Sequence, residues 1–200
     1  MESESLLVAA ATAAAVTTAS YMMIARSADK RQRKSPFTAK IEADDINSIK
    51  ELFHSSAPFS VEIAVHHIGR NISIYASVPA KWETKAKQIL DKAYPGRWSE
   101  SDVSVIFHHG GEYDAASANF SKSKLDEIDL GAIDFSAVNE IGEGASVLIQ
   151  KEGSDFALYA VASAPSQFQL REIMASLVGS LKKVDCRMAR DKAEIAAKFQ

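Results

Sequence analysis

The sequence has few of the residues and motifs that most often carry chemistry. Cys186 is the single cysteine, so an internal disulfide is excluded, and no Cys/His spacing around it indicates a metal site. No GxxxxGK[ST] segment is present, which excludes a P-loop within these residues. HHGG at residues 108–111 is similar to the oxyanion loop of some esterases, but no GxSxG segment supplies a nucleophile. We predict no catalytic residue and no cofactor.

Positive charge is also scarce outside one stretch. The formal net charge is −3, yet five cationic residues lie between Arg26 and Lys34, which leaves the remainder of the chain acidic. A broad nucleic-acid surface needs a basic footprint, so we expect no direct nucleic-acid binding. The shares of hydrophobic residues, 46%, and charged residues, 24%, are ordinary for a folded protein.

Residues 6–25 form an uncharged run, LLVAAATAAAVTTASYMMIA. A helix of about 20 residues crosses roughly 30 Å of hydrocarbon, so the run predicts a transmembrane helix, although much of it is Ala and Thr. A cleaved signal peptide and an Ala-rich soluble helix are the alternatives, but the acidic start is unlike that of a signal peptide. The basic cluster after the run predicts that residues 1–35 are a single-pass anchor in the inner (cell) membrane, with the soluble part cytoplasmic.

Residues 61–78, VEIAVHHIGRNISIYASV, predict a β-hairpin. A two-residue turn at Gly69 and Arg70 places Val61 opposite Val78 and Ile63 opposite Ala76. One face of the pair is then mostly apolar and the other mostly polar, because successive residues of a strand point to opposite faces.

The segments around this hairpin predict a ferredoxin-like unit at residues 36–108. Apolar spacing and turn residues predict, in chain order, a strand, a helix, the hairpin, a second helix after Pro79 and a last strand, at residues 37–42, 46–53, 61–78, 80–94 and 103–107. This βαββαβ order is typical of a four-stranded antiparallel sheet with strand order 4-1-3-2 and both helices on one face.

Residues 125–188 repeat the pattern and predict a second ferredoxin-like unit. Gly153 and Tyr159 lie 84 residues after Gly69 and Tyr75. A two-residue turn at Gly153 and Ser154 then pairs Val147 with Ala160 in a second hairpin. Pro165 opens the following helix as Pro79 does. The predicted core face of that helix consists of Phe168, Ile173, Leu177 and Leu181.

The rest of the second unit and its flanks are predicted from weaker signals. Residues 128–133 and 184–188 are predicted strands, and residues 134–141 repeat the spacing of the first helix. Residues 109–124 are polar and aperiodic, which predicts a linker. Residues 189–200 predict a C-terminal helix or the start of a missing region. The fold class expected is therefore α+β, with two tandem antiparallel units; one larger mixed sheet with two similar hairpins is the alternative.

Histidines and aromatic residues are the remaining candidates for a site. The pairs His66-His67 and His108-His109 are interpreted as structural or solvated, because adjacent strand residues point to opposite faces, so we predict no metal site. Aromatic residues on an outer sheet face would resemble those of RNA-binding sheets, but the RNP patterns are missing. Partner packing is favoured over RNA binding, and ordinary half-buried packing is favoured over both. The candidate partner-contact residues are Tyr75, Tyr159 and Trp82.

Four segments of the chain resemble an uncharacterised family of membrane-anchored proteins from uncultivated bacteria with reduced genomes. They are AVHHIG at 64–69, ISIYASVP at 72–79, AYPG at 93–96 and DFSAVNEIGEGASVLIQ at 134–150. The resemblance covers residues 36 to 182. It implies an anchor and a soluble region that is often followed by a helicase-like or type IV secretion ATPase domain, and it transfers no catalytic residue. The chain differs from the family pattern at Arg70 and ends before an ATPase region.

These observations favour a non-enzymatic, membrane-anchored scaffold that positions a type IV secretion-like or DNA-translocating ATPase. Its expected partners are membrane lipid at residues 6–25, that ATPase and, as a further possibility, a second copy of the chain. The alternative hypothesis is a ligand-binding sensor domain, which predicts an apolar pocket between the two units.

Overall fold

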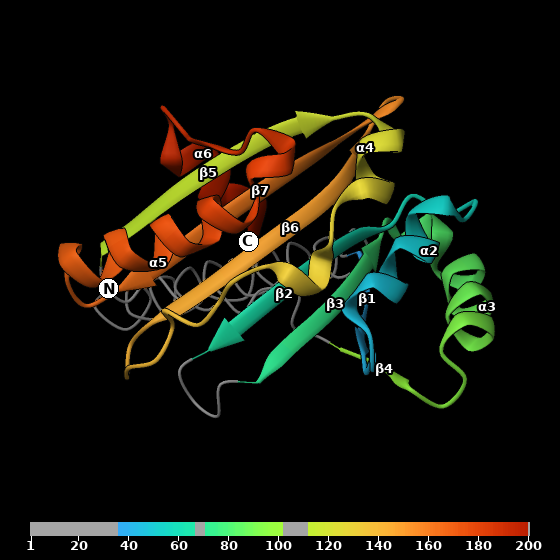
Figure 1. Cartoon of the computed structure of the whole chain (residues 1–200). Coiled ribbons are helices and arrows are strands. Elements are labelled where there is room, and N and C mark those ends of the chain that lie inside the picture. The colour runs from blue at the N-terminus through green and yellow to red at the C-terminus, as the bar shows by residue number, and fades with distance from the viewer. Residues whose placement is uncertain (1–35, 67–70, 102–111, 200) are drawn as a thin grey trace, which may run out of the picture. The chain divides into compact units, whose positions relative to one another are not determined.

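Eight antiparallel strands hydrogen-bond into one sheet in the computed structural model, which describes residues 36–66, 71–101 and 112–199 (Figure 1). The order across the sheet is β4-β1-β3-β2-β6-β7-β5-β8. In chain order the strands are β1 (Phe37–Ile41), β2 (Ser60–His66), β3 (Ile72–Val78), β4 (Trp98–Glu100), β5 (Glu112–Phe120), β6 (Gly144–Glu152), β7 (Asp155–Ala164) and β8 (Arg187–Met188). The fold class is α+β, as the sequence predicts.

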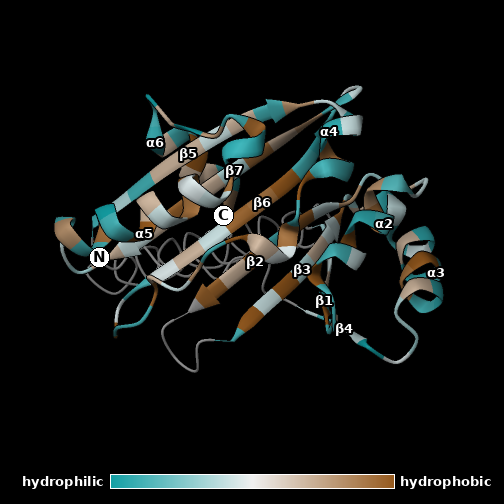
Figure 2. Cartoon of the chain, in the orientation of Figure 1, coloured by the Kyte–Doolittle hydropathy of each residue, from teal (hydrophilic) through white to brown (hydrophobic). Residues whose placement is uncertain are grey.

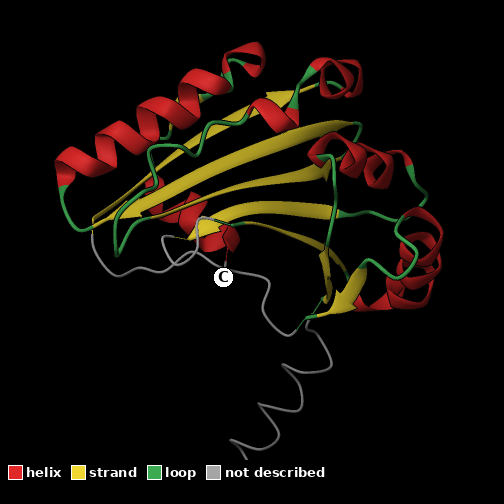
Figure 3. Cartoon of the chain, turned by 60° about the horizontal axis from the view of Figure 1, so that its bottom comes forward, coloured by secondary structure: helices red, strands yellow, loops and turns green. Residues whose placement is uncertain are grey.

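Helical segments connect the strands. Those of the first half are η1 (Ile46–Ile49), α2 (Lys50–His54), η2 (Ala80–Trp82) and α3 (Glu83–Ala93). Those of the second half are α4 (Lys122–Glu127), η3 (Leu130–Ala132), α5 (Gln167–Ser180), η4 (Lys182–Val184), α6 (Lys192–Ala196) and η5 (Ala197–Phe199). The longer helices lie on one face of the sheet, and α6 lies on the opposite face (Figure 3).

The strand order repeats within the sheet. Counted from the outer edge, the first half reads β4-β1-β3-β2 and the second reads β8-β5-β7-β6. Each half therefore places its first and third strands in the middle and its second strand at the centre of the whole sheet. Hydrophobic residues occupy the middle of β2 and of β6, the strands that meet there (Figure 2).

The predicted register is confirmed in one hairpin and wrong in the other. In β6 and β7, Val147 pairs with Ala160 and the turn contains Gly153 with φ 65°, as predicted. In β2 and β3, Ile63 pairs with Ile74 rather than with Ala76, so the predicted register is wrong by two residues. A shift of two keeps every side chain on its predicted face, so alternation could not distinguish the two registers. The turn predicted at Gly69 and Arg70 includes residues outside those described.

Strands β2 and β6 join the halves. Their antiparallel register pairs Ile63 with Val147, two residues that are 84 positions apart in the chain, as Tyr75 and Tyr159 are. The pairing is therefore centred on equivalent positions of the two hairpins, as in an isologous contact. On the face opposite the longer helices, Ser146 Oγ donates a 2.6 Å hydrogen bond to Glu62 Oε1, and both side chains are buried.

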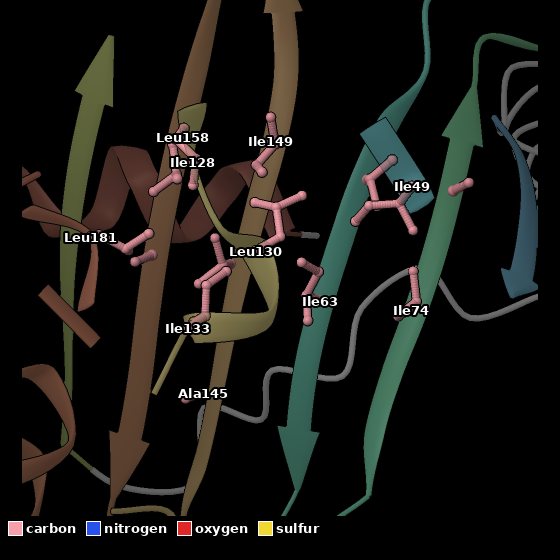
Figure 4. Close-up of a cluster of buried hydrophobic side chains, with 14 of the residues drawn as sticks. Ile49, Ile63, Ile74, Ile128, Leu130, Ile133, Ala145, Ile149, Leu158 and Leu181 are labelled. Atoms are coloured by element: carbon pink, nitrogen blue, oxygen red, sulfur yellow. The ribbon is translucent and has the colours of Figure 1, made fainter. Parts of the chain in front are cut away.

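The helical layer also crosses this central seam. Asn47 in η1 donates through Nδ2 to Asp129 Oδ1 at 2.8 Å and accepts from the Leu130 amide at 2.9 Å. His54 in α2 hydrogen-bonds Asp126 in α4 at 2.9 Å. Beneath these contacts a continuous cluster of buried side chains includes Ile49, Ile63, Leu130, Ile133 and Ile149 (Figure 4).

Strand β5 corrects the predicted linker at residues 109–124. Its sequence, EYDAASANF, lacks the branched residues that favour strands, so local preference did not reveal it. Pairing with β7 along its whole length and with β8 at Ala116 and Ser117 makes it a strand. Small residues suit this position, because Ala115 packs against the α6 side and Ala116 against the α5 side of the sheet.

Two neighbouring predictions are also wrong. Residues 128–133, predicted as a strand, contain the 3₁₀ turn η3, whose N-cap Asp129 accepts from the Gly131 amide at 3.0 Å. Residues 134–141, predicted as a helix, form turns. The apolar spacing in both segments arises from residues of the main core, since Leu130, Ile133, Phe135 and Val138 are buried there.

Several predictions fall outside the described residues. They concern the anchor at residues 1–35, the strand at 103–107, and His67, His108 and His109. Within the described ranges, no helix has the length and apolar character needed to span a bilayer.

Replacing Asn47 by Ala tests the link between the halves in the helical layer. The change removes two hydrogen bonds and leaves the Leu130 amide without its acceptor, so we expect a loss of about 1–2 kcal/mol in unfolding free energy. Urea titration followed by circular dichroism measures it. Asn119→Ala, at an exposed position of β5, is the matched control and should change stability by less than about 0.5 kcal/mol. Equal stability of the two variants would contradict the role of Asn47.

Candidate binding surfaces

The three residues predicted as partner contacts do not form one surface. Tyr75 lies in β3, where it pairs with Glu62 and Lys40, and Tyr159 lies in β7, with β2 and β6 between them. Both tyrosines are buried, 9% and 8% exposed. Trp82 is half-buried in η2 and packs on the main core. As partner contacts all three stay a prediction.

Tyr159 is covered by the C-terminal segment. Ile195 and Phe199 of this segment pack on Leu148, Tyr159 and Val161, which form a second apolar cluster on the open face of the sheet. The Lys198 ammonium lies 5.2 Å from the centre of the Tyr159 ring.

The hydroxyl of Tyr159 is held as a neutral donor. It donates a 2.7 Å hydrogen bond to Glu152 Oε1. Burial, and then this hydrogen bond to a carboxylate, raise the pKa of Tyr159 to about 12. The aromatic ring and its hydroxyl therefore serve packing on this face.

Two large apolar side chains stand out of the surface on segments that the Glu140–Gln169 hydrogen bond joins. Ile141, in the loop before β6, is 85% exposed, and Phe168, in the first turn of α5, is 70% exposed. Phe168 was predicted to lie on the core face of its helix, which is wrong. Leu170, Ile173, Met174 and Leu177 make that face, and Phe168 is about 200° around the helix from Leu170. We name these two residues the Ile141–Phe168 patch.

The loop that carries Ile141 is tied to α5. Gln169 Nε2 donates to Glu140 Oε2, and Ser176 Oγ donates to Asp134 Oδ2. Gly142 has φ 88° and lies so close to Pro165 that an added Cβ would be 3.0 Å from its ring. The patch is therefore presented by a segment fixed on both sides of Ile141.

Glu143 organises the same loop from inside. Its side chain is buried, and Oε2 accepts from the amides of Asn139 at 2.7 Å and Glu140 at 2.8 Å. These charge-assisted bonds satisfy backbone donors that no regular element would satisfy in this loop. The GEGA segment of the sequence thus has a structural role in holding the exposed Ile141.

An open groove of about 560 Å³ separates α5 from the edge strand β8. Its apolar lining consists of Met174, Ala175, Val178, Gly179, Cys186 and Met188. Charged residues complete the lining, namely Asp114, Arg171, Lys182 and Asp185. We name this feature the α5–β8 groove.

The corresponding place in the first half is filled. Phe37 in β1 and Trp98 in β4 meet edge to face, with ring centres 6.2 Å apart, on the α3 side of the sheet. The Trp98 indole donates to Asp91 in α3 at 3.0 Å, and Lys87 of α3 lies 5.3 Å from the Phe37 ring centre. Lys87 also pairs with Glu83 and Glu100, which raise its pKa. Aromatic rings and paired charges thus fill the space between α3 and β4. The equivalent space between α5 and β8 is open.

The charges of the groove differ in their pairing. Asp185 accepts two hydrogen bonds from the Arg187 guanidinium, and Asp114 accepts from the amide of Ala115 at 2.9 Å. Within residues 36–66, 71–101 and 112–199, the side chains of Arg171 and Lys182 form no ion pair. The groove therefore presents two available cations beside an apolar surface.

Cys186 forms part of the groove wall as a neutral thiol. Its side chain is 7% exposed, and burial, followed by the Asp185 charge, raises its pKa to about 11. A thiol is a poor nucleophile compared with a thiolate, so this residue suits packing rather than covalent chemistry.

Buried hydrophobic side chains line the seam between the halves. Ile49, Leu130, Ile133 and Ile149 fill it on the helical side (Figure 4).

Comparisons with known proteins assign no family. No protein-family model and no curated protein matches the sequence. A crystal structure of aclacinomycin oxidoreductase is 8% identical, with a TM-score of 0.45, over 76% of this chain and 42% of that one. An anthrone oxidase-like protein is 9% identical, with a TM-score of 0.28, over 78% and 94%. Aminoacylhistidine dipeptidase from Vibrio alginolyticus is 7% identical, with a TM-score of 0.27, over 77% and 39%. These similarities assign the chain no activity.

High pH tests the environment of Tyr159. Its pKa is raised to about 12 in the folded chain and is about 10 when unfolded, so stability present below pH 10 is lost as pH rises toward 12. We expect the unfolding free energy to fall more steeply between pH 10 and 12 in the wild type than in Tyr159→Phe. Urea titrations at several pH values measure the slopes, and titrations at pH 7 supply the baseline difference. Parallel curves would contradict the assignment.

Alkylation tests the state of Cys186. With a pKa of about 11, roughly one thiol in a thousand is ionised at pH 8, so iodoacetamide should react far more slowly than with a free cysteine. The same chain in urea is the control, because its unfolded cysteine has a pKa of about 8.5. Equal rates in the folded and unfolded chain would show that Cys186 is exposed and ionised.

Proposed function

We propose that the chain is a non-enzymatic, membrane-anchored interaction module built from two ferredoxin-like units, and that it positions a secretion-type or DNA-translocating ATPase. The strand orders β4-β1-β3-β2 and β8-β5-β7-β6 support the ferredoxin-like part, because that fold orders its strands 4-1-3-2. The uncharged run at residues 6–25 and the basic residues after it support the anchor. The family resemblance supports the kind of partner.

The Ile141–Phe168 patch is the observation on which the interaction role rests. Large apolar side chains are favoured in the interior, so two that are 85% and 70% exposed on adjacent, well-tied segments need a reason. Aromatic residues are enriched in the buried centres of protein interfaces. A partner with an apolar pocket would bury both side chains, and the fixed loop would lose little conformational entropy on binding.

Polar residues around the patch fit the rim of such an interface. Glu140 and Gln169 are joined to each other, and Gln167 Nε2 donates to Glu112 Oε2 at 2.6 Å. These groups are already paired in the free chain, so they need no new partner when water leaves the interface. We therefore expect the apolar pair to supply most of the binding energy, as interface hot spots do.

Site-specific crosslinking in native membranes tests this function. A photoreactive phenylalanine at position 168 of the full chain should crosslink to an ATPase of the secretion or DNA-translocating class, identified by mass spectrometry. Truncating a hot spot costs about 2 kcal/mol or more, so Ile141→Asp with Phe168→Asp should lower capture of that ATPase at least tenfold. The ATPase is then quantified by pull-down.

Ile72→Asp is the matched control for that experiment. It introduces the same charge at another exposed apolar residue, 44% exposed on β3, and should leave capture unchanged. Capture that survives the double variant, or crosslinks only to proteins that are not ATPases, would overturn the proposal.

The alternative function, a ligand-binding sensor, draws on a different observation. The hypothesis predicted a pocket between the two units, and the α5–β8 groove that supports it lies wholly within the second half.

A further inference from the structure

We propose that the α5–β8 groove binds a small amphiphilic carboxylate, whose hydrocarbon part lies on the apolar wall and whose carboxylate pairs with Arg171 or Lys182. This inference is independent of the partner that the Ile141–Phe168 patch would bind. It is carried by the shape of the groove, by its lining and by the difference between the two halves.

The size and lining suit a small ligand. Ligand sites commonly occupy about 300–1,000 Å³, are mostly apolar and contain few polar groups, and the groove has about 560 Å³. Met174 and Met188 stand on its two walls, and the flexible methionine side chain adapts to varied hydrocarbon shapes. From Arg171 to Gly179 the α5 wall is about 12 Å long, at about 1.5 Å per residue.

Charge selects an acid over an amine. The carboxylate of Asp185 is paired with Arg187, and that of Asp114 accepts an amide hydrogen, so both acids already have a donor. Arg171 and Lys182 have no ion pair within the described part of the chain, and they bracket the apolar lining of α5 in sequence. Arg binds a carboxylate through two parallel hydrogen bonds, which makes it the stronger of the two partners.

The first half supplies a built-in contrast. There the equivalent cation, Lys87 on α3, already pairs with two glutamates, and Phe37 and Trp98 occupy the space between helix and sheet. The first half therefore fills this space with its own side chains. The second half leaves the space open beside available cations, so only the second half is suited to bind a ligand there.

Cys186 provides a readout that is local to the groove. It is the single cysteine of the chain, so its alkylation by iodoacetamide reports occupancy of this groove and not binding of an amphiphile at residues 6–25. The experiment uses the full chain and decanoate, decanol and decylammonium as probes, at concentrations below those at which they form micelles. Decanoate should slow alkylation saturably and by at least tenfold. Decanol should give the same protection only at a concentration at least tenfold higher, and decylammonium should give no protection.

Two variants separate binding from folding. Arg171→Gln with Lys182→Gln should raise the decanoate concentration for half protection at least tenfold, whereas Lys151→Gln, an exposed lysine on β6, should not. Gly179→Leu should fill the groove, because a Cβ at Gly179 meets nothing within 4 Å. Leucine also favours helix over glycine, so this variant should melt at or above the wild-type temperature while decanoate no longer changes its alkylation.

Four outcomes would overturn the proposal. They are an alkylation rate that decanoate leaves unchanged, equal protection by decanoate and decylammonium, equal protection by decanoate and decanol, and unchanged protection in the Arg171/Lys182 variant. Alkylation that slows with rising protein concentration in the absence of a probe would assign the groove to a second copy of the chain instead.

Discussion

The pairing of β2 with β6 is the contact on which the rest of the described structure depends. An unpaired strand at either position would expose its amides and carbonyls and the hydrophobic residues on its helical face. Pairing the two strands with each other satisfies both sets of groups and makes one core from two. The contacts of Asn47 with Asp129 and Leu130 are possible only because this pairing brings η1 beside η3.

Helix α5 shows how the fold creates its two candidate surfaces. A helix that covers a sheet needs one apolar stripe, and in α5 this stripe consists of Leu170, Ile173 and Leu177. The helix has further apolar residues on two other sides. Phe168 points away from the protein beside Ile141, and Val178 borders the groove toward β8. More apolar surface than the sheet can cover is therefore present on a single helix, in two separate places.

The sequence predicted the local features of the fold well. Alternating residues and Gly153 were sufficient for the second hairpin, because a two-residue turn determines its register. The helix that follows Pro79 and the strand at Phe37–Ile41 were likewise evident from short-range pattern. Strand β5 was missed because its alanines and serines have no strand preference of their own and are held by β7 and β8. The single sheet was only the alternative prediction, since the pattern of one strand does not specify its neighbour in the other half.

The candidate surfaces were harder to predict than the fold. Phe168 was assigned by its spacing to the core face with Ile173, Leu177 and Leu181, whereas the buried positions of Leu170 and Ile173 show that it faces outward. One signal against that assignment was available: Phe168 does not share the spacing of about 3.6 residues that relates Ile173, Leu177 and Leu181. The groove has no sequence signature of its own. It is recognised only by comparison with the other half, where Phe37 and Trp98 fill the corresponding space.

Joining the halves in one chain has a consequence for how the protein can change. In a symmetric pair of identical subunits every substitution occurs twice, so a residue that closes a space in one subunit closes it in the other. The centre of the β2–β6 pairing at Ile63 and Val147 has the geometry of such a pair, but in this chain each position is encoded separately. A substitution in one half can then add or remove a binding surface while the other half continues to supply its part of the sheet.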